Sequence, residues 1–251
     1  MNRISTVLLT IQTFAQVGLI VRLVASKLRR TYPFFFSYIA LALVQSAVLA
    51  MFPRDSLPYR YVWATTLILM DCMQALVVSE LYTVVLRDLG GFARLARRYV
   101  KIAFALAVIV SLLLLALEKT PKGPVGTAVI VDRVVAVALV ILVLLITGFL
   151  VYYPIPLSKN TVVYSIGFAA YFSTKSAGRI LETISTSWYN EVNLVFLIVP
   201  TACLIYWMAA LNQKGEEKSI VIGHRWNPEE EERLLAQLKE INASLLRAAR
   251  K

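Results

Sequence analysis

The stretch TAVIVDRVVAVALVILVLLITGFLVY, residues Thr127 to Tyr152, decides the fold class. After Asp132 and Arg133 it continues to its end without another charged residue. A helix needs about 20 apolar residues to cross the hydrocarbon core of a bilayer. The stretch therefore predicts a membrane-spanning helix, and we expect the chain to be an integral membrane protein.

The composition of the whole chain agrees with this expectation. Of the 251 residues 59% are hydrophobic, and the mean hydropathy is +0.69, whereas soluble domains contain about 45–50% apolar residues. The net charge of +11 would suggest a nucleic-acid partner in a soluble protein. Here the basic residues cluster between the hydrophobic runs, as topology signals do. We therefore expect contact with the lipid bilayer and no binding of nucleic acid.

Six further apolar runs have the length of a membrane span, so the predicted fold is all-α, with seven transmembrane helices in one bundle over residues 1–211. The expected spans are Ile4–Ala25, Pro33–Phe52, Tyr61–Leu86, Val100–Leu117, Thr127–Tyr152, Thr161–Thr183 and Val192–Leu211. The fourth is almost purely apolar, and we expect it to be the helix most exposed to lipid.

The basic residues predict the orientation of the bundle. Ten fall in the connections on one side of the expected spans and five on the other. By the positive-inside rule the N-terminus is outside and the C-terminus is cytoplasmic, as in a multi-pass protein of a bacterial-type plasma membrane. The most basic connection, Arg87–Lys101, has two interpretations: a site for anionic lipid or a topology signal at the membrane surface.

The sixth expected span contains YSIGFAAYFSTKSAGRILET, residues Tyr164 to Thr183, with Lys175, Arg179 and Glu182 on one helical face. A charge at mid-bilayer costs roughly 2.5–3.5 kcal/mol on insertion scales, so such residues face the interior of a bundle. The neighbouring face, with Ala169, Ser173 and Ala177, predicts close helix packing.

Other spans carry polar side chains at the same depth. Together they predict an outward-facing cavity that binds a small polar or anionic ligand, and the candidate binding residues are Gln12, Gln16, Gln45, Asp71, Gln74, Asp132, Arg133, Tyr171, Lys175, Arg179 and Glu182. The alternative is structural: Asp71 pairs with Lys175 and Arg179 with Glu182, and nothing binds. Glu80 points away from this group, and we expect it to pair with Arg87 near the inner surface.

The sequence contains no pattern for a catalytic centre, a metal or a cofactor. His224 is the only histidine, and Cys72 and Cys203 each lie inside an apolar run. The expected topology resembles that of seven-helix receptors and microbial rhodopsins. The retinal-binding lysine of the last span, the DRY and NPxxY motifs of receptors, and the several histidines of ceramidase-like hydrolases are not in the sequence.

After the last expected span the composition changes. Residues 212–227 predict a polar linker, and 228–251 predict a cytoplasmic amphipathic helix that begins with Asn227 as its N-cap and Pro228 at its first position. A heptad seam follows the positions Leu234, Leu238, Ile241 and Leu245. The seam fits a homodimer contact or a cytoplasmic partner, and it equally fits a helix that lies on the protein's own inner face.

These features predict a membrane sensor or signalling scaffold, with the cavity as input and the tail helix as output, rather than an enzyme. A small-solute transporter with three helices on each side of the fourth is the second interpretation, because Tyr32-Pro33 and Tyr153-Pro154 begin corresponding spans. An intramembrane enzyme that acts on lipid is the third.

Overall fold

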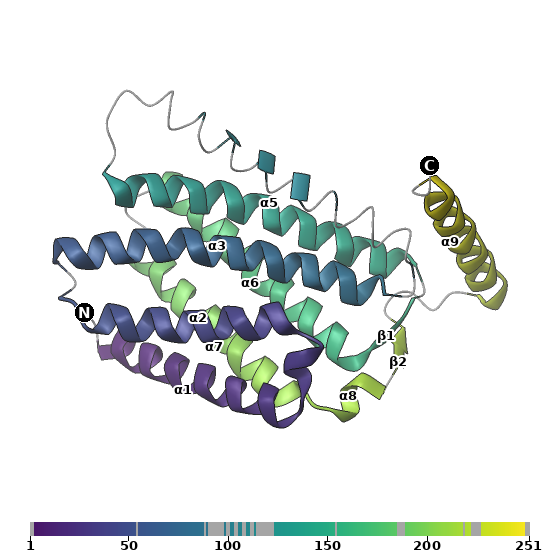
Figure 1. The fold of residues 1–251 in the computed structure, drawn as a ribbon, viewed down its shortest axis with the longest axis horizontal. Helices are drawn as coiled ribbons and strands as arrows, with labels where there is room; N and C mark the ends of the chain where they lie inside the picture. Colours follow the sequence, from purple (N-terminus) through teal and green to yellow (C-terminus); the bar gives the residue numbers. More distant parts are fainter. Residues whose placement is uncertain are drawn as a thin grey trace.

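The chain folds into a bundle of long helices with one short two-stranded sheet (Figure 1). This computed structural model describes residues 3–53, 55–87, 89, 98, 101–102, 105–106, 109–110, 113, 123–153, 155–184, 189–217, 219–221 and 227–248. The long helices are α1 Arg3–Ala25, α2 Pro33–Ala50, α3 Leu57–Val85, α5 Pro124–Tyr152, α6 Lys159–Ile184 and α7 Tyr189–Ala210. Proline in the first turn of α2, α3 and α5 sets the starting φ angle without losing a helical hydrogen bond.

Four of these helices are long and apolar enough to cross a membrane: Thr6–Ala25, Pro33–Ala50, Leu57–Val85 and Val125–Tyr152. The described apolar part of α7, Leu194–Ala210, is shorter. The sixth expected span does form the continuous helix α6, but its charged residues lower its hydropathy. Most of the fourth expected span and of the Arg87–Lys101 connection lies outside the described residues. The few described positions of that span, such as Ile102, Leu106 and Leu113, are exposed.

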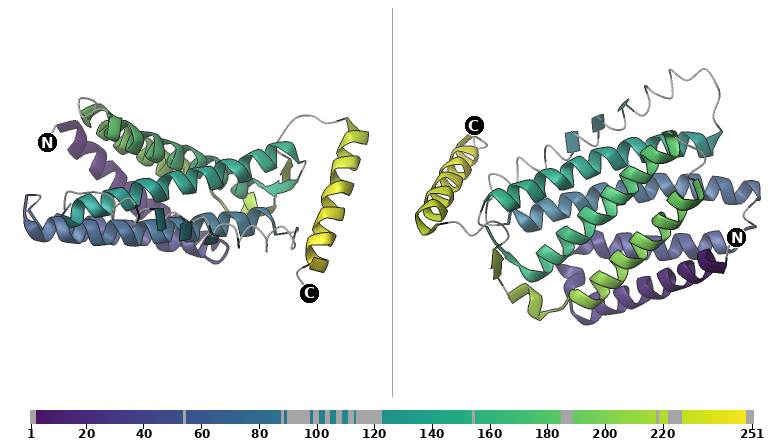
Figure 2. Two further views of the ribbon diagram at one scale, coloured as in Figure 1. Left: turned by 90° about the horizontal axis from the view of Figure 1, so that it is seen from above. Right: turned by 180° about the vertical axis from the view of Figure 1, so that it is seen from behind.

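The six long helices form a closed ring. They pack in the order α1, α2, α3, α5, α6, α7, and α7 returns to α1. Seen from behind, α6 and α7 cross the other helices obliquely (Figure 2). Arg22 of α1 holds the junction, because its Nε donates to Leu211 O at 2.5 Å and its Nη2 to Ala209 O at 3.1 Å. These carbonyls end α7 and have no helical partner of their own.

Glycines rather than the expected small-residue face bring α6 and α7 together. A methyl group added at Gly167 would collide with the indole of Trp207, and one at Gly178 would collide with the ring of Phe196. Of the expected packing face, Ala169 packs against the hydrophobic core, whereas Ala177 is exposed. Ala169 and Ser173 line an open apolar groove between α5 and α6. The rings of Trp207 and Phe196 determine this contact, because each ring fits only where the opposing helix carries no side chain.

An aromatic layer fills the half of the bundle toward the end of α7. Its members are Phe35, Tyr164, Phe168, Phe172 and Trp207, all at most 2% exposed. The ring centroids of Phe35 and Trp207 lie 5.0 Å apart, and those of Phe168 and Trp207 lie 4.6 Å apart. Such tilted and edge-on contacts are favourable beyond the area they bury.

Glu80 does not pair with Arg87, contrary to the sequence-based prediction. Its carboxylate accepts hydrogen bonds from Phe34 N at 2.6 Å, from Phe35 N at 3.2 Å and from Tyr164 Oη at 2.8 Å. Arg87 lies beyond α3 and is exposed. Glu80 therefore caps the start of α2 from the neighbouring helix and satisfies two of its free amides. The free amides of a helix N-terminus are stronger partners for a buried carboxylate than an exposed guanidinium.

The segment expected to be a polar linker contains regular structure. It holds the short helix α8, Lys214–Glu217, and the strand β2, Ser219–Val221, which pairs antiparallel with β1, Pro156–Ser158. Glu216 Oε1 accepts from Tyr32 Oη at 2.9 Å and from Asn160 Nδ2 at 2.8 Å. We call this contact of α8 with the starts of α2 and α6 the clasp. Burial, with Glu216 beside it, raises the pKa of Tyr32.

The tail helix α9, Pro228–Ala248, lies at the end of the bundle opposite the N-terminus (Figure 1). Two positions of its heptad seam, Leu234 and Leu238, are buried, and Leu238 joins the main hydrophobic core. Ile241, the next position, is 43% exposed. One part of the seam is therefore covered by the chain itself, and the other part is open.

Candidate functional site

Three helices meet at Lys175. Its Nζ lies 3.0 Å from Asp71 Oδ1 of α3 and 2.6 Å from Asp132 Oδ1 of α5, and it donates to Gln74 Oε1 at 2.8 Å. All four side chains are buried. The sequence predicted the contact between Lys175 and Asp71, which is present, but not the second carboxylate.

This geometry surrounds the lysine with two hydrogen-bond acceptors and a second carboxylate. An ammonium group has three N–H donors and no acceptor. The three acceptors around Nζ all lie within 3.0 Å. An incoming anion would have to displace one of them. The arrangement neutralises a buried cation, and it also fixes the relative positions of α3, α5 and α6.

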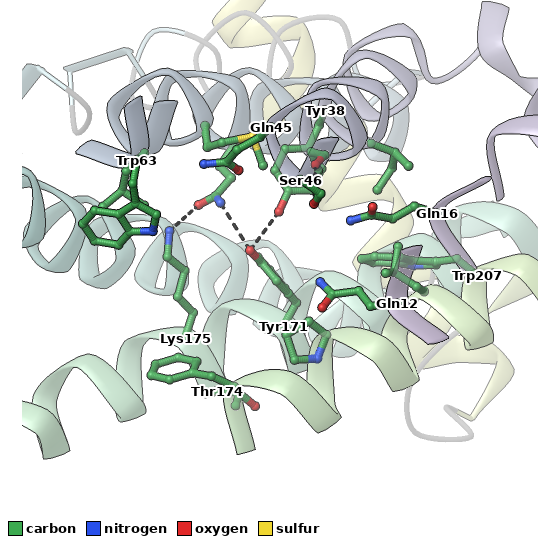
Figure 3. A pocket seen from close by; sticks show the side chains of 18 of the residues that line it. Gln12, Gln16, Tyr38, Gln45, Ser46, Trp63, Tyr171, Thr174, Lys175 and Trp207 are labelled. Atoms are coloured by element: carbon green, nitrogen blue, oxygen red, sulfur yellow. Dashed lines mark hydrogen bonds between the residues drawn. The ribbon is translucent and has the colours of Figure 1, made fainter. Parts of the chain in front are cut away.

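A chain of hydrogen bonds leads from Lys175 across the bundle (Figure 3). Gln74 Oε1 accepts a hydrogen bond from Lys175 Nζ, and Gln74 Nε2 in turn donates to Tyr171 Oη at 3.3 Å. The hydroxyls of Tyr171 and Tyr38 lie 2.8 Å apart and share a hydrogen bond. The polar wall formed by these four residues therefore belongs to α2, α3 and α6.

This wall faces a cavity of about 610 Å³ inside the ring of helices. A volume of this size is typical of small-molecule sites, which span about 300–1,000 Å³. The lining comes from α1, α2, α3, α6 and α7, and it consists of Gln12, Gln16, Tyr38, Ile39, Ala42, Gln45, Ser46, Tyr59, Trp63, Leu67, Met70, Gln74, Tyr171, Thr174, Lys175, Phe196, Pro200, Leu204 and Trp207.

The cavity continues toward the bundle end at which the N-terminus lies. A second hollow of about 470 Å³ between α1 and α2 shares Gln12, Ser46 and Tyr59 with it, and reaches Phe52 in the connection after α2. At the opposite side the cavity meets Trp207, a member of the aromatic layer. The bundle thus contains a polar cavity toward the N-terminus, and aromatic side chains fill its interior toward the end of α7.

The structure places six of the candidate residues on the cavity lining: Gln12, Gln16, Gln45, Gln74, Tyr171 and Lys175. Asp71 and Asp132 are not among the lining residues; they contact Lys175 Nζ. Arg133 is half-buried on α5 and does not line the cavity. Arg179 and Glu182 lie on α6, but their side chains fall outside the part that the structure describes.

Sequence reasoning missed the aromatic part of the lining. Tyr38, Tyr59, Trp63 and Trp207 all contribute to it. A hydropathy count treats these residues as ordinary span residues, so it gives no signal. The available signal was helical spacing: Tyr59 and Trp63 lie four residues apart and precede Met70 and Gln74 on one side of α3.

The described residues offer binding chemistry. Hydroxyls, carboxamides and two indoles surround the space, and Lys175 is the one charged side chain among the lining residues that are described. No group of three or more His, Cys, Asp or Glu side chains within the described ranges is placed to hold a metal ion.

Comparison with known proteins does not identify this site. No protein family, no curated protein and no solved structure matches the chain.

Proposed function

We propose that this protein is a multi-pass membrane sensor or signalling scaffold that receives a small polar solute in the cavity and passes the signal to the tail helix. The observation that carries the proposal is the cavity of about 610 Å³ with its polar wall inside a bundle of apolar helices. Polar groups placed within a bilayer are expensive, and they are typically retained at functional sites.

The proposed topology has seven spans with the N-terminus outside. The ends of α1 and α3 and the starts of α2 and α6 meet near Arg22, Lys27, Arg29, Arg30, Arg87 and Lys159. This basic end is cytoplasmic in our proposal, by the positive-inside rule. The cavity then opens to the outside, and α9 lies in the cytoplasm.

The path from input to output runs through rigid contacts. Trp207 of the aromatic layer lines the cavity, and Tyr164 of the same layer donates to Glu80 of α3, which caps the start of α2. The clasp then joins the starts of α2 and α6 to α8, which precedes α9. A ligand that moves Trp207 therefore shifts elements that contact the tail.

A small-solute transporter is the alternative. It needs a polar route through the cytoplasmic half, and the aromatic layer fills that half in the described conformation. This observation favours a sensor over a transporter.

Cysteine accessibility in oriented membranes tests the proposal. The background is the full chain with both native cysteines replaced, Cys72→Ser and Cys203→Ser. Ser46→Cys and Leu23→Cys are then introduced into it one at a time. Ser46 of α2 lines the cavity, whereas Leu23 is wholly buried near the end of α1 and is not among the lining residues. A membrane-impermeant thiol reagent should modify Ser46→Cys from outside and Leu23→Cys from neither side.

Two other outcomes contradict the proposal. Modification of Leu23→Cys from the cytoplasmic side would indicate a transporter that opens inward. An unreactive Ser46→Cys would mean that the cavity is closed to water, and the sensor proposal would fail.

A further inference from the structure

We propose that the cavity selects an uncharged polar solute with both hydrogen-bond donors and acceptors, and that Gln12 and Gln16 of α1 recognise it. This inference rests on the proposed function, because it names the ligand class of the same cavity. It replaces the broader expectation of a polar or anionic ligand.

The charge of the lining disfavours an anionic ligand. Lys175 is the one charged side chain among the described lining residues, and its Nζ already donates to Asp71 and Gln74 and lies 2.6 Å from Asp132 Oδ1. An anion that enters would lose its hydration inside an apolar bundle and meet no unpaired cation among the described lining residues. The carboxylates of Asp71 and Asp132, which contact Lys175, would also repel an anion.

Several polar side chains of the lining already have protein partners. Gln74, Tyr171 and Tyr38 bond to one another in the chain described above. Gln45 donates through Nε2 to Thr66 Oγ1 at 2.8 Å. These side chains shape the cavity, and their polar groups are partly or wholly satisfied without a ligand.

Gln12 and Gln16 differ from the other glutamines. They lie one helical turn apart on α1 and both line the cavity (Figure 3). Gln16 is 4% exposed, and its Oε1 is buried without a hydrogen-bond partner among the described residues. A buried amide oxygen without a partner is costly, and native proteins keep one mainly where something else satisfies it.

The carboxamides of Gln12 and Gln16 indicate a class of ligand. A carboxamide offers an acceptor oxygen and two N–H donors, so a matching solute carries both kinds of group. Trp63 and Trp207 add indole surfaces to the same cavity. Polar groups for orientation beside aromatic faces for contact are typical of sites for small organic ligands. Sugars, amides and nucleobases share this chemistry.

The first experiment measures which charge the cavity admits. The full chain with Cys72→Ser, Cys203→Ser and Gln16→Cys reacts with three methanethiosulfonates of similar size: hydroxyethyl (neutral), trimethylammonioethyl (cationic) and sulfonatoethyl (anionic). Rates are divided by those for a free thiol in solution. We expect the neutral reagent to react and the anionic one to be roughly tenfold slower or more.

Phe14→Cys is the matched control. It lies two residues from Gln16 on α1, and its side chain is 73% exposed on the outer surface of the bundle. We expect none of the water-soluble reagents to modify it in a bilayer. Reaction at Gln16→Cys but not at Phe14→Cys assigns the access to the cavity.

The second experiment needs no ligand. If the Gln16 carboxamide is unpaired in the empty protein, Gln16→Leu should raise the melting temperature or leave it unchanged. Gln74→Leu is the comparison, because it removes an acceptor from Lys175 and should lower the melting temperature.

The outcomes separate this inference from the proposed function. An anionic reagent as fast as the neutral one overturns the ligand class while the cavity stands. A loss of stability in Gln16→Leu as large as in Gln74→Leu makes the carboxamide structural and overturns its recognition role. If no reagent modifies Gln16→Cys or Ser46→Cys, the cavity itself is closed, and the proposed function fails together with the inference.

Discussion

Lys175 Nζ lies 2.6 Å from Asp132 Oδ1, a shorter contact than the one it makes with Asp71. The cation therefore joins α6 to α5 as well as to α3. A single pair would fix two helices, whereas this cluster fixes three.

Lys175→Met should strongly destabilise the bundle. It leaves Asp71 and Asp132 buried without their cation, and breaking a buried pair in this way costs about 3–5 kcal/mol. Adding Asp71→Asn and Asp132→Asn should recover part of this loss. Thermal and SDS-induced unfolding measure the effect, and Lys159→Met, at an exposed position of α6, is the control. Equal stability of the two lysine variants would contradict the cluster's role.

Glu80→Ala should destabilise the start of α2, because two backbone amides and Tyr164 lose their acceptor. Buried groups left without partners cost about 1–3 kcal/mol. Arg87→Ala should change the unfolding free energy by less than about 0.5 kcal/mol, as exposed substitutions usually do. If both variants lose the same stability, Glu80 and Arg87 act as a pair after all.

Gly167→Ala should separate α6 from α7, because the new methyl group collides with Trp207. Overpacking typically costs about 1–3 kcal/mol. Gly148→Ala is the matched control on α5, where an added Cβ meets nothing within 4 Å. The control should be neutral or gain about 0.5–1 kcal/mol from helix propensity. A measurable loss in Gly148→Ala would show that the effect is not specific to the Trp207 contact.

Tyr32 makes the clasp sensitive to alkaline pH. Its pKa is raised by burial and by Glu216, above an ordinary value of about 10. A raised pKa contributes stability that is complete below the unfolded value and is lost as the pH rises toward the folded one. The melting temperature should therefore fall above about pH 10, and Tyr32→Phe should fall less steeply. Parallel curves for the two proteins would remove Tyr32 from the explanation.

Deleting Pro228–Lys251 should leave the bundle inserted and folded. The long helices close their ring without α9, and the clasp lies before it in the chain. Burial of Leu234 and Leu238 in the full chain predicts only a modest loss of melting temperature. Detergent-solubilised protein should elute as a single peak in size exclusion. Aggregation or loss from the membrane would make α9 part of the fold rather than an output element.

The sequence predicted the elements of the fold well, because hydropathy acts on each helix separately. The predicted start of α2 at Pro33 and the end of α5 at Tyr152 agree with the structure. The common level of Lys175 and Asp71 along the bundle was also predictable, since it follows from their positions along the two expected spans. Six candidate residues line the cavity for the same reason.

The partners of the buried polar groups were not predictable in this way. Which side chains meet depends on the order and rotation of the helices, and a single sequence does not contain this information. Asp132 reaches Lys175 because α5 packs beside α6, and Glu80 meets α2 because α3 lies between α2 and α5. The clasp depends on a fit between Gly215 and Asn160 that no periodicity reveals.

The bond from Arg22 to Leu211 also imposes an order on biosynthesis. Its acceptor leaves the ribosome 189 residues after its donor, a delay of roughly 10 to 40 s at about 5–20 residues per second. In the proposed topology α1 has inserted during this interval but α7 does not yet exist, so Gln12 and Gln16 would face lipid, a neighbouring helix or the insertion machinery. The nascent chain therefore passes through an open arc of helices, and an insertase that shelters polar side chains of α1 would speed its maturation.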